Sequence, residues 1–154
     1  MKSNIELGQF GENLACEYLV ENNFKLIERN FRQKWGEIDI IVKAPDKTLV
    51  FVEVKTVRDV EKLHLGNDKQ SNVGQISAED QLTDAKLTKL QRTASLYANH
   101  NPEIVDDGKG WRIDLVAITI KGALSEPAEG IYGEPAEPLT IFKKDYVIKH
   151  YENI

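Results

Sequence analysis

Apolar residues recur at helical spacing near the start of the chain. Four of them lie three or four positions apart, namely Leu7, Phe10, Leu14 and Tyr18. Side chains at this spacing line one side of an α-helix and form a stripe that can pack against a core. The pattern therefore predicts a helix over residues 7–22.

Three segments with the composition of β-strands follow. Residues 24–32 contain aromatic and β-branched side chains, and residues 35–43 and 48–55 alternate between polar and apolar positions. Alternation with a period of two is typical of strands. Residues 43–48 contain a proline and an aspartate, which favour a turn, so the second and third strands are expected to form a β-hairpin.

A polar stretch separates this hairpin from a second helix. Residues 56–80 show little periodicity and predict a long loop, and loops of more than about 12–15 residues are often functional. Leucines and alanines at helical spacing then predict a helix over residues 81–99. Residues 111–120 are rich in β-branched side chains and predict a central strand.

The last part of the chain is acidic and rich in proline and glycine before apolar residues return. Residues 122–138 hold three of the five prolines and contain Glu-Pro-Ala-Glu twice, which predicts a loop. A short strand is expected at residues 139–142 and a helical turn at residues 146–151. The order helix, three strands, helix, strand predicts an α/β fold, a mixed sheet flanked by helices in one domain over residues 1–154.

Composition narrows the class of protein. The chain has 154 residues, of which 41% are apolar and 29% charged, enough for a folded core without disulfides or a structural metal. The single cysteine, Cys16, excludes an internal disulfide and suits a reducing compartment. The first residues lack the apolar stretch of a signal peptide, and no apolar run approaches the ~20 residues of a membrane span. We therefore expect a cytoplasmic protein with no membrane partner.

The net charge of −5 is unusual for a protein that binds nucleic acid. Four glutamates lie within residues 122–138, which contain no lysine or arginine. Removing these four negative charges leaves a net charge of −1 for the rest of the chain. A local basic surface is therefore compatible with the composition.

The predicted hairpin brings charged side chains together. If the hairpin folds about Asp46, Asp39 lies opposite Glu53, and Glu37 lies opposite Lys55. Directly opposed residues of antiparallel strands have Cβ atoms about 4.5–5.5 Å apart, so two carboxylates at these positions could bind one ion. A register slip of one residue would remove the alignment.

The alternative is an ordinary solvated strand face. Against it, residues 49–52 are apolar on both faces, which is typical of a strand covered on both sides. Like charges in such surroundings repel and lose hydration unless a positive group joins them. Lys55 supplies one such charge, and a divalent cation would supply the rest. Carboxylate oxygens without a nearby thiol or imidazole favour Mg²⁺ or Mn²⁺, and an ion of this kind beside a lysine suits phosphodiester hydrolysis.

Asp39 followed by Glu53-Val54-Lys55 on a hairpin resembles the metal-binding signature of the PD-(D/E)xK nucleases. More specifically, the chain resembles the YraN family of small bacterial proteins, whose fold is similar to that of Holliday-junction resolvases. The segments that carry this resemblance are Gly8-Gln9-Phe10-Gly11-Glu12, Glu28-Arg29-Asn30-Phe31-Arg32, Gly36-Glu37-Ile38-Asp39, Phe51-Val52-Glu53-Val54-Lys55, Lys86 with Leu90, Ala94 and Tyr97, and Trp111-Arg112-Ile113-Asp114-Leu115-Val116.

The resemblance implies a restriction-endonuclease-like fold and specific roles in the site. Asp39 and Glu53 match the metal ligands, Lys55 matches the catalytic lysine, and Glu12 matches a glutamate that resolvase-like members place near the metal. Small residues surround Glu12 on its helix, so that this face of the helix can approach the sheet closely. Glu37, opposite Lys55 in the predicted register, joins the catalytic set. Without the resemblance, Glu12 would be interpreted as a solvent-facing helix residue.

Three basic residues are expected to contact nucleic acid. Arg32 and Lys86 lie in the matching segments, and Arg58 follows Lys55 at an offset that differs from the usual family pattern. The long loop at residues 56–80 and the acidic loop at residues 122–138 are further departures. They affect the expected substrate geometry more than the expected metal binding.

The resulting function hypothesis is a nuclease that uses Mg²⁺ or Mn²⁺ to hydrolyse phosphodiester bonds of DNA, with branched or single-stranded structures as candidate substrates. The alternative is a nucleic-acid-binding or scaffold protein that keeps the nuclease fold with little or no activity. A purely structural interaction protein is a third hypothesis. DNA is the expected partner, and a homodimer is a candidate assembly.

Other chemically capable residues carry weaker signals. His64, His100 and His150 are scattered without the spacing of a zinc site. Arg112 and Asp114 are expected to form a structural ion pair, with a supporting role in the site as the alternative. Trp35 and Trp111 each begin a predicted strand, and core edges are favoured over base-stacking platforms.

Overall fold

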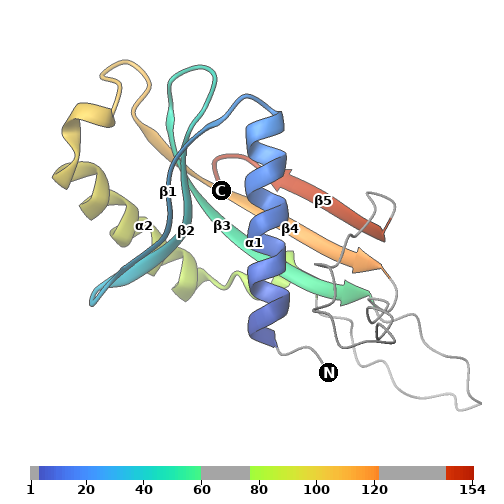
Figure 1. The fold of residues 1–154 in the computed structure, drawn as a ribbon. Helices are drawn as coiled ribbons and strands as arrows, with labels where there is room; N and C mark the ends of the chain where they lie inside the picture. Colours follow the sequence, from blue (N-terminus) through green and yellow to red (C-terminus); the bar gives the residue numbers. More distant parts are fainter. Residues whose placement is uncertain (1–3, 60–76, 122–144) are drawn as a thin grey trace, which may run out of the picture.

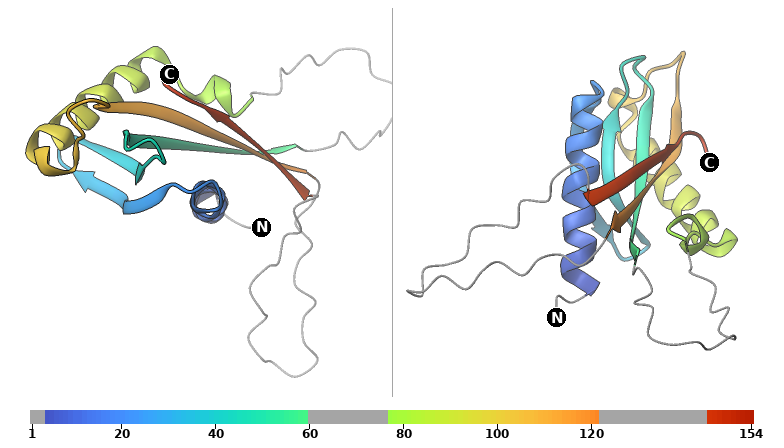
Figure 2. Two further views of the ribbon diagram at one scale, coloured as in Figure 1. Left: turned by 90° about the horizontal axis from the view of Figure 1, so that it is seen from above. Right: turned by 90° about the vertical axis from the view of Figure 1, so that its right-hand side faces the viewer.

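Five strands form one mixed sheet with a helix on either face. The computed structural model describes residues 4–59, 77–121 and 145–154 (Figure 1). Viewed from above, α1 and α2 lie on opposite sides of the sheet (Figure 2). The elements are α1 (Asn4–Glu21), β1 (Lys25–Gln33), β2 (Gly36–Lys43), β3 (Leu49–Asp59), α2 (Asp84–His100), β4 (Trp111–Lys121) and β5 (Tyr146–Tyr151), with short 3-10 turns η1 (Glu79–Gln81) and η2 (Pro102–Ile104). The predicted α/β class is confirmed.

The sheet has the strand order β1-β2-β3-β4-β5. Strand β2 is antiparallel to both β1 and β3, β4 is parallel to β3, and β5 is antiparallel to β4. The parallel step requires a crossover connection, and α2 lies within it. Strand β3 is therefore the middle strand, paired with β4 along its whole length from Leu49–Trp111 to Asp59–Lys121.

The β2–β3 hairpin has the register that the sequence predicts. Ile40 pairs with Val52 and Lys43 with Leu49, as folding about Asp46 requires. The turn is closed by the Ala44 N–H, which donates to the Thr48 carbonyl at 2.9 Å, and the Asp46 carboxylate accepts from the Thr48 N–H at 3.0 Å. These local bonds stabilise the register.

Helix α1 packs on one face of the sheet. Its apolar stripe buries Leu14, Ala15 and Leu19 and leaves Leu7, Phe10 and Tyr18 partly buried, which confirms the predicted stripe. We call the buried cluster on this face the α1-side core; it consists of Leu14, Ala15, Leu19, Phe24, Ile40, Val42, Ala44, Val50, Val52, Val54, Val116, Ile118 and Ile120.

Helix α2 packs on the opposite face. Its N-cap is Thr83, whose side chain accepts a hydrogen bond from the Lys86 N–H, and its C-cap is Asn101. We call the cluster on this face the α2-side core; it consists of Ile38, Ile41, Leu49, Phe51, Leu90, Ala94, Tyr97, Ala98 and Ile113. A Cβ at Gly36 would overlap the buried Thr93 side chain, so the glycine allows α2 to approach β2 closely.

One predicted strand end and one predicted element type were wrong. Residues 56–59, expected to begin a loop, continue β3, because their backbone groups pair with Ile118–Lys121 of β4. Residues 146–151, expected to form a helical turn, form β5. Val147 and Ile148 are β-branched, and burial alternates along the strand, so the segment suits the free edge of β4.

Several expectations concern residues outside the described ranges. They are the acidic loop at residues 122–138, the short strand at residues 139–142, and most of the long loop at residues 56–80. No helix among the described residues is long and apolar enough to cross a membrane.

The contact between Gly11 and Thr56 provides a test of how closely α1 packs. A Cβ at Gly11 would overlap the Thr56 side chain, whereas a Cβ at Gly8, one turn earlier, would meet nothing within 4 Å. We expect Gly11→Ala to lower the free energy of unfolding by about 1–3 kcal/mol through overpacking. The matched control, Gly8→Ala, is expected to raise it by up to about 1 kcal/mol through helix propensity. Urea denaturation measures both, and equal stabilities of the two variants would contradict the close approach.

Candidate active site

Asp39 lies where strands β2 and β3 separate. The paired register of the two strands ends at Ile40 and Val52. Immediately beyond this pair, Asp39 Oδ2 accepts a hydrogen bond from the Val54 N–H at 2.8 Å. The carboxylate thus bonds to a backbone group that the ladder itself does not reach. Asp39 is fixed in place by the strand that carries Glu53 and Lys55.

Strand β2 also changes the face that it presents at Asp39. Residues two apart in a regular strand share a face, yet Ile38 belongs to the α2-side core and Ile40 to the α1-side core. On the neighbouring strand, Asn30 has a φ of 52° and falls between the pairs Arg29–Ile40 and Phe31–Ile38. The irregularity places Asp39 at the point where the hairpin twists away from β3.

The electrostatic surroundings of Asp39 are unfavourable for its charge. Burial raises its pKa, the Glu53 carboxylate raises it further, and the Val54 N–H bond lowers it. Glu12 adds a smaller increase and Lys55 a smaller decrease. Together these effects raise the pKa of Asp39 from its ordinary value to about 7. Near neutral pH a large fraction of the protein therefore holds this carboxyl protonated.

Glu53 and Lys55 form a close ion pair beside Asp39. The Lys55 Nζ lies 2.8 Å from Glu53 Oε1, and the two side chains are only 19% and 18% exposed. Both residues belong to the middle strand, paired with Leu115 and Ala117 of β4. Pairing with β4, together with the Val54 N–H bond to Asp39, thus constrains the backbone that carries them.

Glu12 reaches this cluster from helix α1. Its side chain is partly buried, and its charge raises the pKa of Asp39. The adjacent Gly11 packs against Thr56, one residue beyond Lys55, which brings this turn of the helix to the sheet. The structure therefore brings together four of the predicted site residues, which are Glu12, Asp39, Glu53 and Lys55.

Glu37 is not brought into this cluster. It pairs across the β1–β2 hairpin with Arg32, at 4.0 Å between Glu37 Oε2 and Arg32 Nε, and the two side chains are 72% and 74% exposed. Its predicted position opposite Lys55 lies beyond the end of the β2–β3 ladder. The twist of the hairpin away from β3 explains the difference.

The three basic residues expected to bind nucleic acid lie on separate elements. Arg32 is exposed near the end of β1, and Arg58 is partly buried on β3, paired with Ile120. Lys86 is exposed on the first turn of α2, where its ammonium group donates to the Gln81 carbonyl at 3.1 Å. Their role in binding stays a prediction.

A second cluster surrounds the fully buried Asp114 on β4. Arg112 Nε and Nη2 donate to its two oxygens at 2.9 and 3.2 Å, as the predicted ion pair requires. His150 Nε2 lies 2.8 Å from Asp114 Oδ2, and the Asn153 N–H donates to Asp114 Oδ1 at 2.9 Å. Burial by itself raises the pKa of Asp114, but these hydrogen bonds and the Arg112 charge more than offset it, so the pKa lies below its ordinary value.

Of this second cluster, the sequence predicts the Arg112–Asp114 ion pair but not the contacts of His150 and Glu152. Asp114, His150 and Glu152 are the group of described residues whose possible ligand atoms all lie within 4.8 Å of one another. Arg112 already supplies the cation, however, because its Nη2 also lies 3.3 Å from Glu152 Oε1. We therefore assign the cluster as an arginine-centred clamp for the C-terminal segment. The available signal was the pair of β-branched residues Val147 and Ile148, which favour a strand that would carry His150 to β4.

Comparison with known protein sequences shows the family to which this chain belongs. Residues 11–118 match the uncharacterised protein family UPF0102. The chain belongs to the UPF0102 family. YraN is the E. coli name for this family, so the family-level resemblance in the sequence is confirmed.

UPF0102 relatives match most of the chain. A UPF0102 protein of Caldicellulosiruptor bescii is 50% identical over 117 residues, which are 76% of this chain and 85% of that protein. One of Corynebacterium efficiens is 31% identical over 151 residues, 97% of this chain and 91% of that protein. One of Syntrophomonas wolfei is 33% identical over 123 residues, 80% of this chain and 92% of that protein. The UPF0102 match spans the Asp39 cluster and Asp114, and it ends before His150.

The raised pKa of Asp39 can be tested by replacing its neighbours. Because Glu53 raises this pKa more than Glu12 does, Glu53→Gln should lower it more than Glu12→Gln. The matched control is Glu37→Gln on the same strand, which should leave it unchanged because Glu37 is exposed and pairs with Arg32. Carbon-13 NMR of the Asp39 carboxyl group across pH measures all three.

The same shift predicts how stability depends on pH. The folded-state pKa of about 7 exceeds the unfolded value of about 3.9, so the folded protein binds more protons between these values. The Asp39 contribution to the free energy of unfolding should therefore fall as the pH rises from about 4 to about 7. Asp39→Asn should remove this dependence in metal-free protein, and an unchanged pH profile would contradict the assignment.

The lowered pKa of Asp114 in the arginine-centred clamp predicts the opposite dependence of stability on pH. Its folded-state pKa is lowered, so its contribution to stability is present above about pH 4 and is lost as the pH falls further. Asp114→Asn should lower the free energy of unfolding at neutral pH by about 1–3 kcal/mol and speed hydrogen exchange in β5. Glu152→Gln, at a side chain 60% exposed, should cost less than about 1 kcal/mol. Equal losses of unfolding free energy in both variants would contradict the assignment of Asp114 as the main acceptor in the arginine-centred clamp.

Proposed function

We propose that this UPF0102 protein is a metal-dependent nuclease that hydrolyses phosphodiester bonds of DNA. The observation that carries the proposal is the convergence of Glu12, Asp39, Glu53 and Lys55 where β2 and β3 separate. Their spacing, Asp39 followed by Glu53-Val54-Lys55, is that of the PD-(D/E)xK signature, which supports the proposal independently of the geometry. Family membership by itself assigns no activity.

The donor set fits a hard divalent cation. Burial is the largest cause of the raised pKa of Asp39, about 7, and repulsion by the Glu53 and Glu12 carboxylates raises this pKa further. A cation among these carboxylates would relieve that repulsion, and carboxylate oxygens without thiols favour Mg²⁺ or Mn²⁺. Asp39 and Glu53 would hold the ion, with Glu12 as their neighbour on α1. When bound, such an ion polarises a phosphoryl oxygen and lowers the pKa of a coordinated water.

Lys55 has a different role, because a protonated ammonium group cannot coordinate a metal. Its Nζ is fixed by the bond to Glu53 Oε1 at 2.8 Å. From this position it can donate a charge-assisted hydrogen bond to a phosphate oxygen and stabilise the negative charge that develops during hydrolysis. Because most of the surface of both side chains is shielded from water, this electrostatic effect is stronger than it would be in solvent.

The same pair favours a second candidate function. Because Lys55 and Glu53 neutralise each other, the site has a stable arrangement without metal or substrate. This arrangement suits a nucleic-acid-binding or scaffold protein that keeps the nuclease fold with little activity. Cleavage assays and binding assays on the same protein distinguish the two functions.

Cleavage should depend on the carboxylates and on added metal. We expect Asp39→Asn and Glu53→Gln each to reduce Mg²⁺- or Mn²⁺-dependent cleavage of branched or single-stranded DNA by at least about 100-fold, the scale of losing transition-state charge stabilisation. Both variants should remain folded, because each removes a repelling charge. Glu37→Gln should retain activity, since Glu37 lies outside the cluster.

Lys55→Ala separates catalysis from metal binding. It should reduce cleavage while leaving Mn²⁺ affinity within a few-fold of the wild-type value, as measured by isothermal titration calorimetry. A large loss of Mn²⁺ affinity would make Lys55 a structural partner of the carboxylates. Wild-type protein that binds DNA without cleaving it, or Asp39→Asn protein that cleaves normally, would reject the nuclease proposal.

A further inference from the structure

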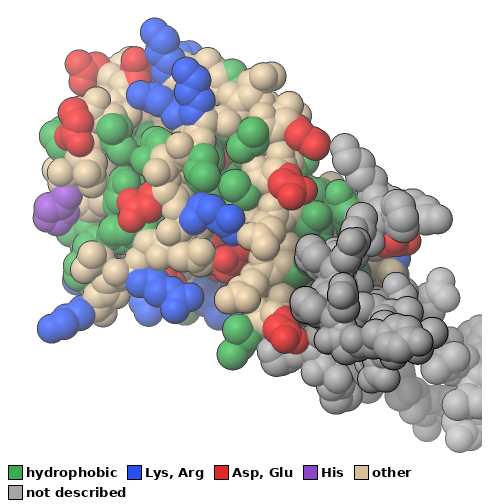
Figure 3. Space-filling model, viewed as in Figure 1, with side chains coloured by type: hydrophobic (Ala, Val, Ile, Leu, Met, Phe, Trp, Pro, Cys, Tyr) green, Lys and Arg blue, Asp and Glu red, His purple; other side chains and the backbone are tan. Residues whose placement is uncertain are grey.

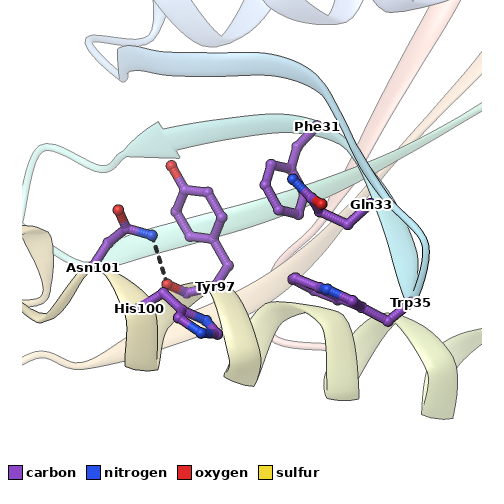
Figure 4. A pocket seen from close by; sticks show the side chains of 6 residues that line it. All are labelled: Phe31, Gln33, Trp35, Tyr97, His100 and Asn101. Carbon is purple, nitrogen blue, oxygen red and sulfur yellow. Dashed lines mark hydrogen bonds between the residues drawn. The ribbon is translucent and has the colours of Figure 1, made fainter.

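A pocket lies beside the β1–β2 hairpin, on the face of the sheet that α2 covers. It has a volume of about 310 Å³ and is lined by Phe31, Gln33, Trp35, Tyr97, His100 and Asn101 (Figure 4). The hairpin supplies the first three residues, and the end of α2 with its C-cap supplies the others. This volume is at the lower end of the range for small-molecule sites, about 300–1,000 Å³, and suits a single ring system.

The aromatic walls of the pocket are held by mutual contacts. The Phe31 ring lies 5.6 Å from Trp35 and 5.0 Å from Tyr97 between centroids, the second contact being edge to face. Tyr97 packs on Phe51 of the α2-side core, and its hydroxyl donates to Glu28 Oε2 at 3.0 Å. Trp35 is only partly buried and keeps some of its surface accessible. The rings therefore form a preorganised surface for a flat ligand.

Amide groups lie beside these rings. The Gln33 side-chain amide makes no hydrogen bond within the described residues and is exposed. Asn101 Nδ2 donates to the Tyr97 carbonyl at 2.8 Å, which fixes the amide while its Oδ1 accepts no bond from a described residue. Amide groups offer both donors and acceptors, the combination that reads the edge of a nucleobase.

Exposed cationic side chains lie on both elements that line the pocket. Arg32 and Lys34 are exposed at the end of the β1–β2 hairpin, and Lys89 and Arg92 are exposed on α2. Figure 3 shows blue side chains at the lower left of the molecule, where Figure 1 places the hairpin tip. A phosphate backbone that passes this pocket would therefore meet positive charge despite the acidic composition of the chain.

We infer that this pocket binds one unpaired nucleobase of a nucleic-acid strand, stacked on Trp35 and contacted at its edge by the Gln33 and Asn101 amides. The inference deepens the proposed function and rests on it for the identity of the ligand. Aromatic stacking with edge contacts is the usual way in which proteins recognise single-stranded nucleic acid. The flanking cations favour a nucleotide over a neutral aromatic side chain of a protein partner.

The two tryptophans provide a matched pair of reporters. Trp111→Phe leaves Trp35 as the only tryptophan of the chain, and Trp35→Phe leaves Trp111, which packs on Phe51 from β4. Each protein is titrated with three ligands in EDTA, so that cleavage plays no part: a single-stranded oligonucleotide, its blunt duplex, and an abasic strand of the same length. Single-stranded DNA should quench Trp35 strongly, the duplex and abasic strand weakly, and none should quench Trp111 comparably.

Affinity measurements complete the test. Gln33→Ala and Trp35→Ala should weaken binding of single-stranded DNA, with Trp35→Ala costing about 5- to 150-fold, while Gln91→Ala on the exposed side of α2 should not. Circular dichroism verifies that each variant is folded. Equal quenching by the abasic strand, or quenching by an aromatic peptide without quenching by DNA, would overturn the inference. Base-dependent quenching in a protein that never cleaves DNA would instead refute only the nuclease proposal.

Discussion

The end of the β2–β3 ladder is the constraint on which the candidate site depends. Beyond Ile40 and Val52 the two strands separate, and the Asp39 carboxylate takes the hydrogen bond of the Val54 N–H. A buried backbone donor needs a partner, so the aspartate is held at the junction even though its charge is unfavourable there. The middle strand then presents Glu53 and Lys55 beside it, and the close approach of α1 at Gly11 brings Glu12.

Two aspartates of the sheet show how neighbouring groups set the direction in which the pKa of a buried carboxyl group shifts. Asp114 is fully buried, yet its pKa lies below the ordinary value because His150, Arg112 and a backbone N–H donate to it. For Asp39, burial is the largest cause of the shift, the Glu53 and Glu12 carboxylates add to it, and the pKa rises to about 7. The first arrangement is electrostatically complete and stabilises the fold. The second holds three carboxylates and one ammonium group, which is why the Asp39 cluster, and not the Asp114 cluster, supports a metal proposal.

Much of the candidate site could be predicted because it depends on short-range sequence. The hairpin register followed from the turn at Asp46, and the ladder has this register from Lys43–Leu49 to Ile40–Val52, the pair that precedes Asp39 and Glu53. The position of Glu37 could not be derived in this way. Strict alternation extends the predicted ladder without limit, whereas β2 and β3 stop pairing after Ile40–Val52, and Glu37 pairs with Arg32 instead. His150 was missed because its contact with Asp114 joins residues 36 positions apart.

By itself, the sequence determined the helices, the hairpin and the identity of the charged residues, because periodicity and turn chemistry act within a few residues. Only the tertiary structure decided that residues 146–151 form a strand, since the backbone groups that they satisfy belong to β4. It likewise decided that Phe31, Trp35 and Tyr97 line a pocket, because Trp35 and Tyr97 are 62 positions apart and meet only through the packing of α2 on the sheet. Local preferences select elements, but the pairing of distant backbone groups and the burial of distant side chains decide where those elements meet.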